Sequence, residues 1–171
     1  MESATHAAKR GATVKGRLAG YGHTTDQFHI TQPDPSGLPL ATAIRAALDR
    51  SGLAPSDIGY INAHGTGTPF NDGTEVAAFA SVFAPEIRDL AISSTKAAIG
   101  HTLGAAGALE AVFCLKSLES GCPPPQINTT NPVPELLGRL AKPGNRLTKK
   151  AVLSVNLGFG GSNAAVIFTS A

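Results

Sequence analysis

The stretch YINAHGTGTPFNDGTE, residues 60–75, changes abruptly from an apolar run to glycine and threonine. The apolar run at 57–63 is short and is typical of a buried strand. Asp72, with Glu75 three positions later, indicates the start of a helix, so we expect Asp72 to be the N-cap and Glu75 to be exposed. A strand, a glycine-rich turn and a helix predict one step of a layered α/β sheet, with His64 at the strand end.

The same alternation continues through the rest of the chain. Leu40, Ile44 and Leu48 recur at helical spacing, which predicts an amphipathic helix. We expect a single α/β domain, a layered mixed β-sheet with helices on both faces that closes with a hairpin. Strands are expected at residues 12–22, 57–63, 89–94, 151–159 and 162–170, and helices at 38–52, 71–85 and 100–121.

The predicted helix at 100–121 is apolar on almost every side. From Leu103 to Leu115 its only charged residue is Glu110. A helix of this kind is typically buried all round, and a buried carboxylate without a partner is strongly destabilising. We therefore expect Glu110 to pair with Lys96, in the loop that enters this helix.

Composition limits the classes of protein to consider. The chain has 171 residues, enough for one domain with a sizeable core. Charged residues make up only 15%, which favours a surface partly covered by a partner chain. The net charge of +2 does not favour a nucleic-acid partner, and no segment has the roughly 18 apolar residues of a membrane span.

The two cysteines do not form a disulfide framework, so we expect a cytoplasmic protein. Cys114 lies in the apolar helix and Cys122 precedes three prolines. Neither has the exposed, electropositive surroundings of a reactive thiol.

Histidines follow two of the predicted strands. His64 follows the strand at 57–63, and His101 follows the strand at 89–94 and opens the next helix. Strand-end loops of α/β sheets form ligand crevices, so the two rings can converge on one site. A helix N-terminus disfavours the imidazolium, which predicts a neutral His101. Two neutral rings that donate to one oxygen would stabilise an oxyanion or enolate.

Spacing alone leaves plainer interpretations open. A histidine near a strand end is more often a structural polar residue than a catalyst, and Lys96 could be a solvated loop lysine. His64 and His101 have no third ligand at metal spacing, so no metal site is expected. Two other histidines, His23 and His29, lie in a polar loop and are expected at the surface.

Three blocks of sequence together resemble one enzyme family. NAHGTGTPFNDGTE (62–75), SSTKAAIGHTLGAAGALEA (93–111) and NLGFGGSNAAVIF (156–168) resemble, in this order and spacing, the β-ketoacyl-acyl carrier protein synthases of the thiolase-like superfamily. Polyketide ketosynthases share the same blocks. The resemblance runs from about Met1 to the C-terminus. It implies a thiolase-like fold and a decarboxylative Claisen condensation of acyl and malonyl thioesters.

The resemblance implies a role for each matching residue. His64 and His101 match two catalytic histidines that donate hydrogen bonds to the malonyl thioester. Lys96 matches the lysine that orders the site, and Glu110 the carboxylate that pairs with it. No bound cofactor is implied, because phosphopantetheine of an acyl carrier protein carries the substrates. The substrate-contacting positions are Thr66 and Thr68, on the phosphopantetheine arm, and Phe159, a gate beside the acyl pocket.

Two departures from the family pattern stand out. Leu157 occupies a position where elongating relatives often carry phenylalanine, so acyl-chain preference does not carry over. The nucleophilic cysteine, which the family holds in the first of two similar halves, is absent. Residues 1–171 therefore resemble the C-terminal half alone, and we expect an incomplete active site.

Three hypotheses follow. The first is the C-terminal half of a ketosynthase for fatty acid or polyketide synthesis, which acts with a cysteine-bearing N-terminal half or partner chain and with an acyl carrier protein, as a homodimer or heterodimer. The second is a non-catalytic partner subunit that shapes a chain-length pocket or docks a carrier protein, although such subunits usually lose the histidines. The third, a thiolase-like acyltransferase that uses acyl-coenzyme A, fits the HGTGT loop poorly.

Overall fold

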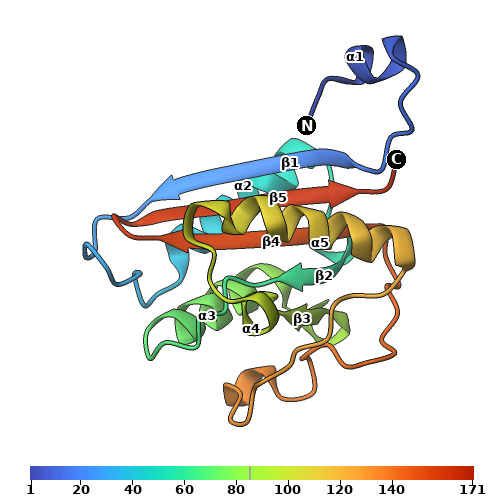
Figure 1. The fold of residues 1–171 in the computed structure, drawn as a ribbon. Coiled ribbons are helices and arrows are strands. Elements are labelled where there is room, and N and C mark those ends of the chain that lie inside the picture. Colours follow the sequence, from blue (N-terminus) through green and yellow to red (C-terminus); the bar gives the residue numbers. More distant parts are fainter. Residues whose placement is uncertain (85) are drawn as a thin grey trace.

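One mixed sheet of five strands organises the chain in the computed structural model, which describes residues 1–84 and 86–171 (Figure 1). Strand β5 runs antiparallel to its neighbours β1 and β4, whereas β2 is parallel to its neighbours β4 and β3. The predicted mixed sheet and its closing hairpin are thus confirmed. In sheet order the strands are β1 (Arg17–Thr25), β5 (Ser162–Thr169), β4 (Ala151–Gly158), β2 (Ile58–Asn62) and β3 (Ala91–Ser93).

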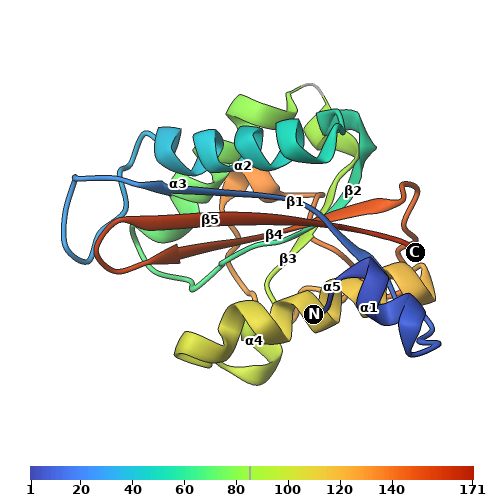
Figure 2. The same ribbon diagram turned by 90° about the horizontal axis from the view of Figure 1, so that it is seen from above.

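Helices cover both faces of this sheet (Figure 2). One face carries α2 and α3, and the other carries α4 and α5. The short helix α1 stands away from the body at the N-terminus (Figure 1). The helix bounds are α1 (Ala4–Lys9), α2 (Leu38–Ser51), α3 (Asn71–Phe83), α4 (Lys96–Ile99) and α5 (Ala106–Ser120).

The central strand β4 shows how the sequence divides the core. Successive side chains of a strand point to opposite faces. Leu153 and Val155 belong to the cluster under α2 and α3, whereas Val152 belongs to the smaller cluster under α5. Asn156 falls in the same alternation as Val152. A polar side chain is thereby placed under the start of α5.

Strand β1 differs from its predicted bounds. The prediction ended the strand at its glycines, but Gly20 and Gly22 lie inside it. A Cβ on Gly22 would lie 1.9 Å from the carbonyl oxygen of Ala43, and one on Gly20 would lie 2.2 Å from that of Ala47. The glycines therefore let the backbone of α2 approach the strand closely, and they do not end it.

Helix α3 begins slightly earlier than the sequence indicates. Its N-cap is Phe70 rather than Asp72. The Asp72 carboxylate instead accepts a hydrogen bond from the backbone N–H of Gly67, at 3.1 Å, and so closes the preceding loop. Pro85, at the end of the predicted helix, lies outside the described residues.

Helix α5 is shorter and more exposed than predicted. It begins at Ala106, because Leu103 has a left-handed backbone with φ of 51° that interrupts a helix starting at residue 100. Its buried residues form one stripe toward the sheet, and the side chain of Val112 on the other side is 54% exposed. The expectation of burial all round is therefore wrong for the chain by itself. We define the outer α5 face by exposed apolar residues of α5 and of the segment that leads into it, namely Ile99, Leu103, Leu109 and Val112.

The segment 121–150, between α5 and β4, runs along the outer edge of the sheet. The backbone N–H of Ile92 in β3 donates to the backbone carbonyl of Arg139, and the N–H of Ala141 donates to the carbonyl of Ile92. This long connection therefore covers the edge of β3. None of the described helices meets the length and apolarity that crossing a lipid bilayer requires.

We predict that Gly22→Ala lowers the free energy of unfolding by about 1–3 kcal/mol, because backbone atoms of α2 occupy the space that the new methyl group needs. Gly73→Ala in α3 is the matched control, since nothing lies within 4 Å of a Cβ at that position. The control is expected to be neutral or stabilising by up to about 1 kcal/mol. Urea unfolding of both variants measures the difference, and equal effects would contradict close packing at Gly22.

Candidate active site

The turn after β2 places His64 at the edge of the sheet. Gly65 has a φ of +48°, a conformation that side chains rarely adopt. A Cβ on Gly65 would also lie 2.5 Å from the Cβ of Ser94 in the neighbouring loop. The Ser94 hydroxyl donates to the backbone carbonyl of His64, at 3.1 Å. The glycine therefore lets the two strand-end loops lie against each other.

The Glu75 carboxylate accepts hydrogen bonds that fix the turn after β2. One carboxylate oxygen accepts the backbone N–H of His64, at 2.8 Å, and the other accepts those of Gly65, at 2.7 Å, and of the Asn71 side chain, at 2.8 Å. The expectation that Glu75 is exposed is wrong, because the side chain is buried. Burial raises the pKa of Glu75 to about 7, despite these three donors, which favour the charged form.

The two histidines meet as predicted. Their ring centroids lie 5.4 Å apart, with the rings nearly perpendicular at 85°. His64 is buried, whereas His101 is exposed. Burial, and next the nearby Lys96 ammonium, lower the pKa of His64 to about 4, so this ring is neutral at pH 7.

Hydrogen bonds give the two rings different tautomers. The backbone N–H of Leu103 donates to Nδ1 of His101, at 3.1 Å, which leaves the proton of the neutral ring on Nε2. In His64, Nδ1 faces the Oδ1 atom of Asn156 at 3.1 Å. An amide oxygen only accepts, so Nδ1 of His64 carries the proton and Nε2 has a lone pair. In this arrangement Nε2 of His101 is a donor and Nε2 of His64 an acceptor, whereas the family pattern implies two donors.

Lys96 and Glu110 form the predicted buried ion pair, which connects α4 to α5. Asn156 completes it, because its Oδ1 accepts from the Lys96 ammonium at 3.3 Å and its Nδ2 donates to the other oxygen of Glu110. These contacts fix the orientation of the amide. The tautomer of His64 therefore depends on the ion pair through Asn156.

A cavity of about 1020 Å³ opens beside the histidines. Thr66, Thr68 and Phe159 all line it, so the structure brings the predicted substrate-contacting residues to one space. Phe159 projects from the β4–β5 turn and is 80% exposed. The walls are otherwise largely apolar and include Leu103, Leu157, Val166 and Phe168.

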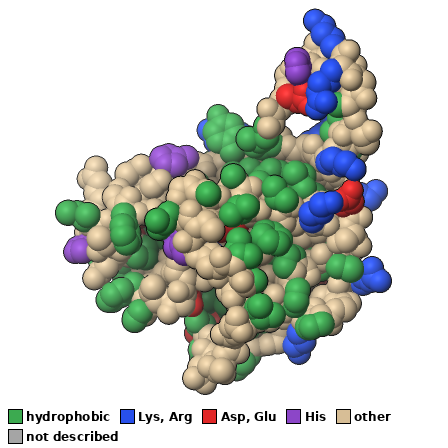
Figure 3. Space-filling model, viewed as in Figure 1, with side chains coloured by type: hydrophobic (Ala, Val, Ile, Leu, Met, Phe, Trp, Pro, Cys, Tyr) green, Lys and Arg blue, Asp and Glu red, His purple; other side chains and the backbone are tan. Residues whose placement is uncertain are grey.

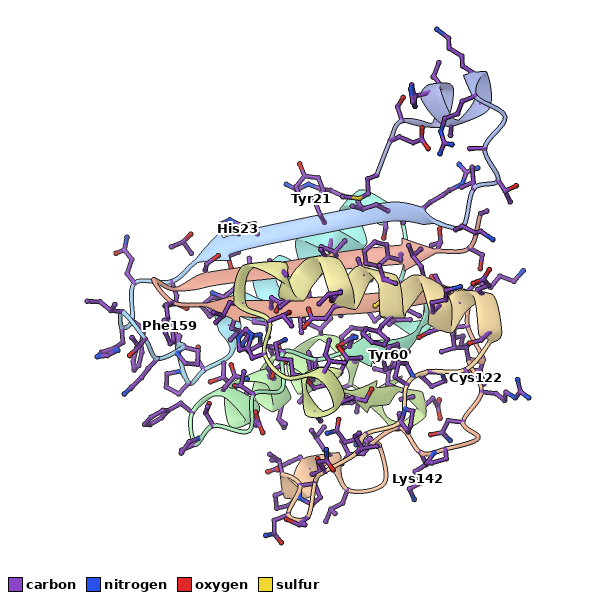
Figure 4. The ribbon with its side chains drawn as sticks, in the orientation of Figure 1. Tyr21, His23, Tyr60, Cys122, Lys142 and Phe159 are labelled. Atoms are coloured by element: carbon purple, nitrogen blue, oxygen red, sulfur yellow. The ribbon has the colours of Figure 1, made fainter. Side chains whose placement is uncertain are left out.

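Neither cysteine lies where it could serve the histidines. Cys114 is buried against the sheet, where burial raises the pKa of its thiol. Cys122 lies at the end of the molecule opposite to Phe159 (Figure 4). In the described part of the chain, no three His, Cys, Asp or Glu side chains gather as they would around a metal ion.

Two site residues were missed from the sequence, Asn156 and Glu75. Both had a signal in the periodicity. Asn156 is the polar member of an alternating apolar strand, and Glu75 precedes Phe79 by one helical turn and Phe83 by two, on the buried face of α3. A polar residue in an apolar stripe indicates a buried hydrogen-bonding group.

The sequence matches the β-ketoacyl synthase C-terminal domain family over residues 15–130, more than half of the chain. The chain belongs to this family. The chain is also 41% identical over 174 aligned residues to the mitochondrial 3-oxoacyl-[acyl-carrier-protein] synthase of Arabidopsis thaliana, covering 99% of this chain and 38% of that protein. The resemblance seen in the three sequence blocks is therefore confirmed.

Solved structures support the same fold. A type II polyketide ketosynthase in complex with its acyl-carrier protein superposes with a TM-score of 0.90 at 32% identity, and the match covers 99% of the present chain and 42% of the ketosynthase chain. The ishigamide ketosynthase/chain length factor gives a TM-score of 0.90 at 34% identity, covering 99% and 41%. The domain thus spans about two fifths of the length of its relatives.

We predict that Glu110→Ala lowers the free energy of unfolding by about 3–5 kcal/mol, because it leaves the Lys96 ammonium buried without its carboxylate. Glu119→Ala is the control, since Glu119 pairs with Lys15 and Lys116 in exposed surroundings and such pairs contribute about 0–1 kcal/mol. Thermal and urea unfolding compare the two. A similar small effect for both variants would show that the α4–α5 pair is not buried.

The pKa values of His64 and Glu75 have opposite effects on acid stability. His64 binds a proton near pH 4 when folded and near 6.5 when unfolded, so its contribution falls as the pH drops from 6.5 to 4. Glu75 binds a proton near pH 7 when folded and near 4.5 when unfolded, so its contribution rises as the pH drops from 7 to 4.5. Each change in the free energy of unfolding amounts to about 3 kcal/mol. Because the two changes have opposite signs, they nearly cancel between pH 4.5 and 6.5.

We therefore predict that Glu75→Gln makes the acid destabilisation caused by His64 measurable, because the opposing effect of Glu75 is removed. The variant lacks the stability that Glu75 gains by binding a proton at low pH. The difference in unfolding free energy between the unmodified domain and the variant should therefore be about 3 kcal/mol larger at pH 4.5 than at pH 7.5. Urea unfolding across this pH range measures the difference. An offset between the two proteins that does not vary with pH would mean that Glu75 is ionised throughout.

Proposed function

We propose that this domain is the histidine-bearing half of a decarboxylating condensing enzyme, a 3-oxoacyl-[acyl-carrier-protein] synthase of fatty acid or polyketide synthesis. The observation that carries the proposal is the pair of imidazole rings, 5.4 Å apart, with unlike hydrogen bonds at their Nδ1 atoms and at the wall of a largely apolar cavity. A donor supports negative charge on a thioester oxygen, and an apolar cavity suits an acyl chain.

His101 is the proposed donor to the malonyl thioester oxygen, through its Nε2–H. The bond between the malonyl methylene carbon and its carboxylate breaks, and the electron pair passes into an enolate that this hydrogen bond stabilises. The enolate carbon then attacks an acyl thioester on a cysteine, a carbon–carbon bond forms, and the thiolate leaves. His64 stays neutral and offers the Nε2 lone pair as an acceptor, for example to a water molecule.

Lys96 and Glu110 are proposed to act indirectly. They hold Asn156, which fixes the His64 tautomer, and the Lys96 charge adds to the low pKa of His64. Thr66 and Thr68 are proposed to contact the phosphopantetheine arm of the carrier protein, and Phe159 to gate the acyl cavity. Their shared position on one cavity wall supports these roles.

The nucleophile must come from another polypeptide segment, because both cysteines are remote from the histidines. The outer α5 face supports a partner, since apolar side chains gather over α5 in the space-filling view (Figure 3). We propose that a cysteine-bearing N-terminal half or partner chain covers this face and that the assembly is a homodimer or heterodimer. The cytoplasmic location expected from the cysteines remains a prediction.

A chain-length-shaping partner subunit is the second candidate, because one similar structure is a ketosynthase/chain length factor. The two candidates differ in what the histidines do. A shaping subunit needs a cavity wall but no oriented imidazoles.

The test uses the domain co-expressed with the N-terminal half of the Arabidopsis relative. We predict that His101→Ala lowers malonyl decarboxylation by about 10²–10³, the loss seen when one oxyanion donor is removed. His64→Ala should also impair this step, whereas acyl transfer to the cysteine should change less in both. The matched control, His23→Ala, alters an exposed ring on β1 whose hydrogen-bond partner among the described residues is the Ser162 hydroxyl. Normal decarboxylation in the His101 variant would favour the shaping subunit.

A further inference from the structure

A second cavity, of about 540 Å³, reaches the histidine site from the other side of the turn after β2. Its outer wall is the segment 126–133. Thr66 and His101 line both this cavity and the acyl cavity, so this pair of side chains separates the two spaces, whereas His64 lines the acyl cavity alone. Each space forms an opening that leads to His101.

The two openings differ in chemistry. Hydrophobic side chains make up much of the acyl cavity wall, among them Leu157, Phe159 and Phe168. The second cavity also has apolar lining residues, such as Phe79, Ile92 and Leu140, but its outer wall adds a run of amide and hydroxyl side chains, namely Gln126, Asn128, Thr129, Thr130 and Asn131. An acyl chain is better accommodated by the first opening, and water or a small polar molecule by the second.

Buried charged groups line the inner end of the second cavity. Lys96 and Glu75 both line it, and both are more than nine-tenths buried. The Lys96 ammonium has three protons, and its two acceptors among the described residues are Glu110 and Asn156. The third proton is thus available to a water or to an anionic oxygen that enters the cavity.

Carboxylates on the same wall argue against tight anion binding. Asp72 and Glu75 both line the second cavity and would repel an anion when ionised. One hydrogen-bond donor beside two carboxyl groups favours weak, transient binding of a small molecule in this cavity over tight binding. The arrangement therefore resembles a passage rather than a storage site.

We propose that the second cavity is the passage through which water reaches the histidine pair and through which the malonyl carboxyl carbon leaves. This inference rests on the proposed function. Decarboxylation breaks one carbon–carbon bond, leaves the electron pair on the thioester enolate and yields one carbon dioxide, which with one water gives bicarbonate and a proton. The other opening then stays occupied by the acyl and pantetheine chains throughout the step.

The first test narrows the passage in the co-expressed enzyme. Thr130→Trp and Asn131→Trp each place a large ring on the outer wall, at exposed positions with no side-chain hydrogen bond to lose. We expect malonyl decarboxylation to fall at least about tenfold, with acyl transfer to the cysteine and the KM for malonyl carrier protein unchanged. Leu137→Trp, an exposed position in the same connection between α5 and β4 but outside the cavity wall, is the matched control. Unchanged decarboxylation in both cavity variants would overturn the proposal.

The second test needs neither turnover nor the N-terminal half. Titration of the domain with bicarbonate, against chloride at equal ionic strength, is followed by ¹⁵N NMR of the imidazoles and the Lys96 ammonium. We expect weak, bicarbonate-specific shifts at Lys96 and His101 that disappear in Thr130→Trp and persist in Leu137→Trp. Shifts that persist in the Thr130 variant, or none in the unmodified domain, would refute the passage. An unmodified enzyme that fails to decarboxylate at all would instead overturn the proposed function, and the inference with it.

Discussion

The buried ion pair between Lys96 and Glu110 connects the two helices on one face of the sheet to the strand that orients His64. Lys96 begins α4 and Glu110 lies in α5, and the amide of Asn156 connects both to the central strand. Such a pair contributes little net stability in a protein interior, but it is strongly unfavourable to break. Its main effect here is orientation, because the amide that it fixes decides which nitrogen of His64 carries the proton.

Most of the architecture could be predicted from local sequence patterns. Apolar runs and helical spacing located all five strands and the three longer helices, and the pairing of Glu110 followed from the cost of burying a charge. The errors have physical causes. Gly20 and Gly22 looked like a strand end because the close approach of α2, which requires them, is a tertiary contact. Helix α5 looked buried because its apolar pattern also serves a surface that the domain leaves uncovered.

The candidate site was predictable in its members but not in its chemistry. His64 and His101 were found from their positions after two strands, and their proximity followed from the parallel pairing of β2 and β3. The unlike tautomers depend on Leu103 and Asn156, a backbone N–H and a side-chain oxygen whose placement requires the folded chain. The second cavity could not be predicted either, because its outer wall comes from the connection between α5 and β4, whose sequence has neither helical nor strand periodicity.

The position of the β4–β5 hairpin makes the sheet depend on contacts between distant parts of the sequence. These two strands are the last elements of residues 1–171, yet they lie between β1 and β2 in the sheet. Before they have docked, β1 has no neighbouring strand and β2 has only the short β3. Contacts between β1 and β5 join residues far apart in sequence, which slows folding and prolongs the exposure of unpaired edges. A partly folded state in which β4 and β5 have not yet docked therefore exposes unpaired strand edges, the feature from which edge-to-edge aggregation starts.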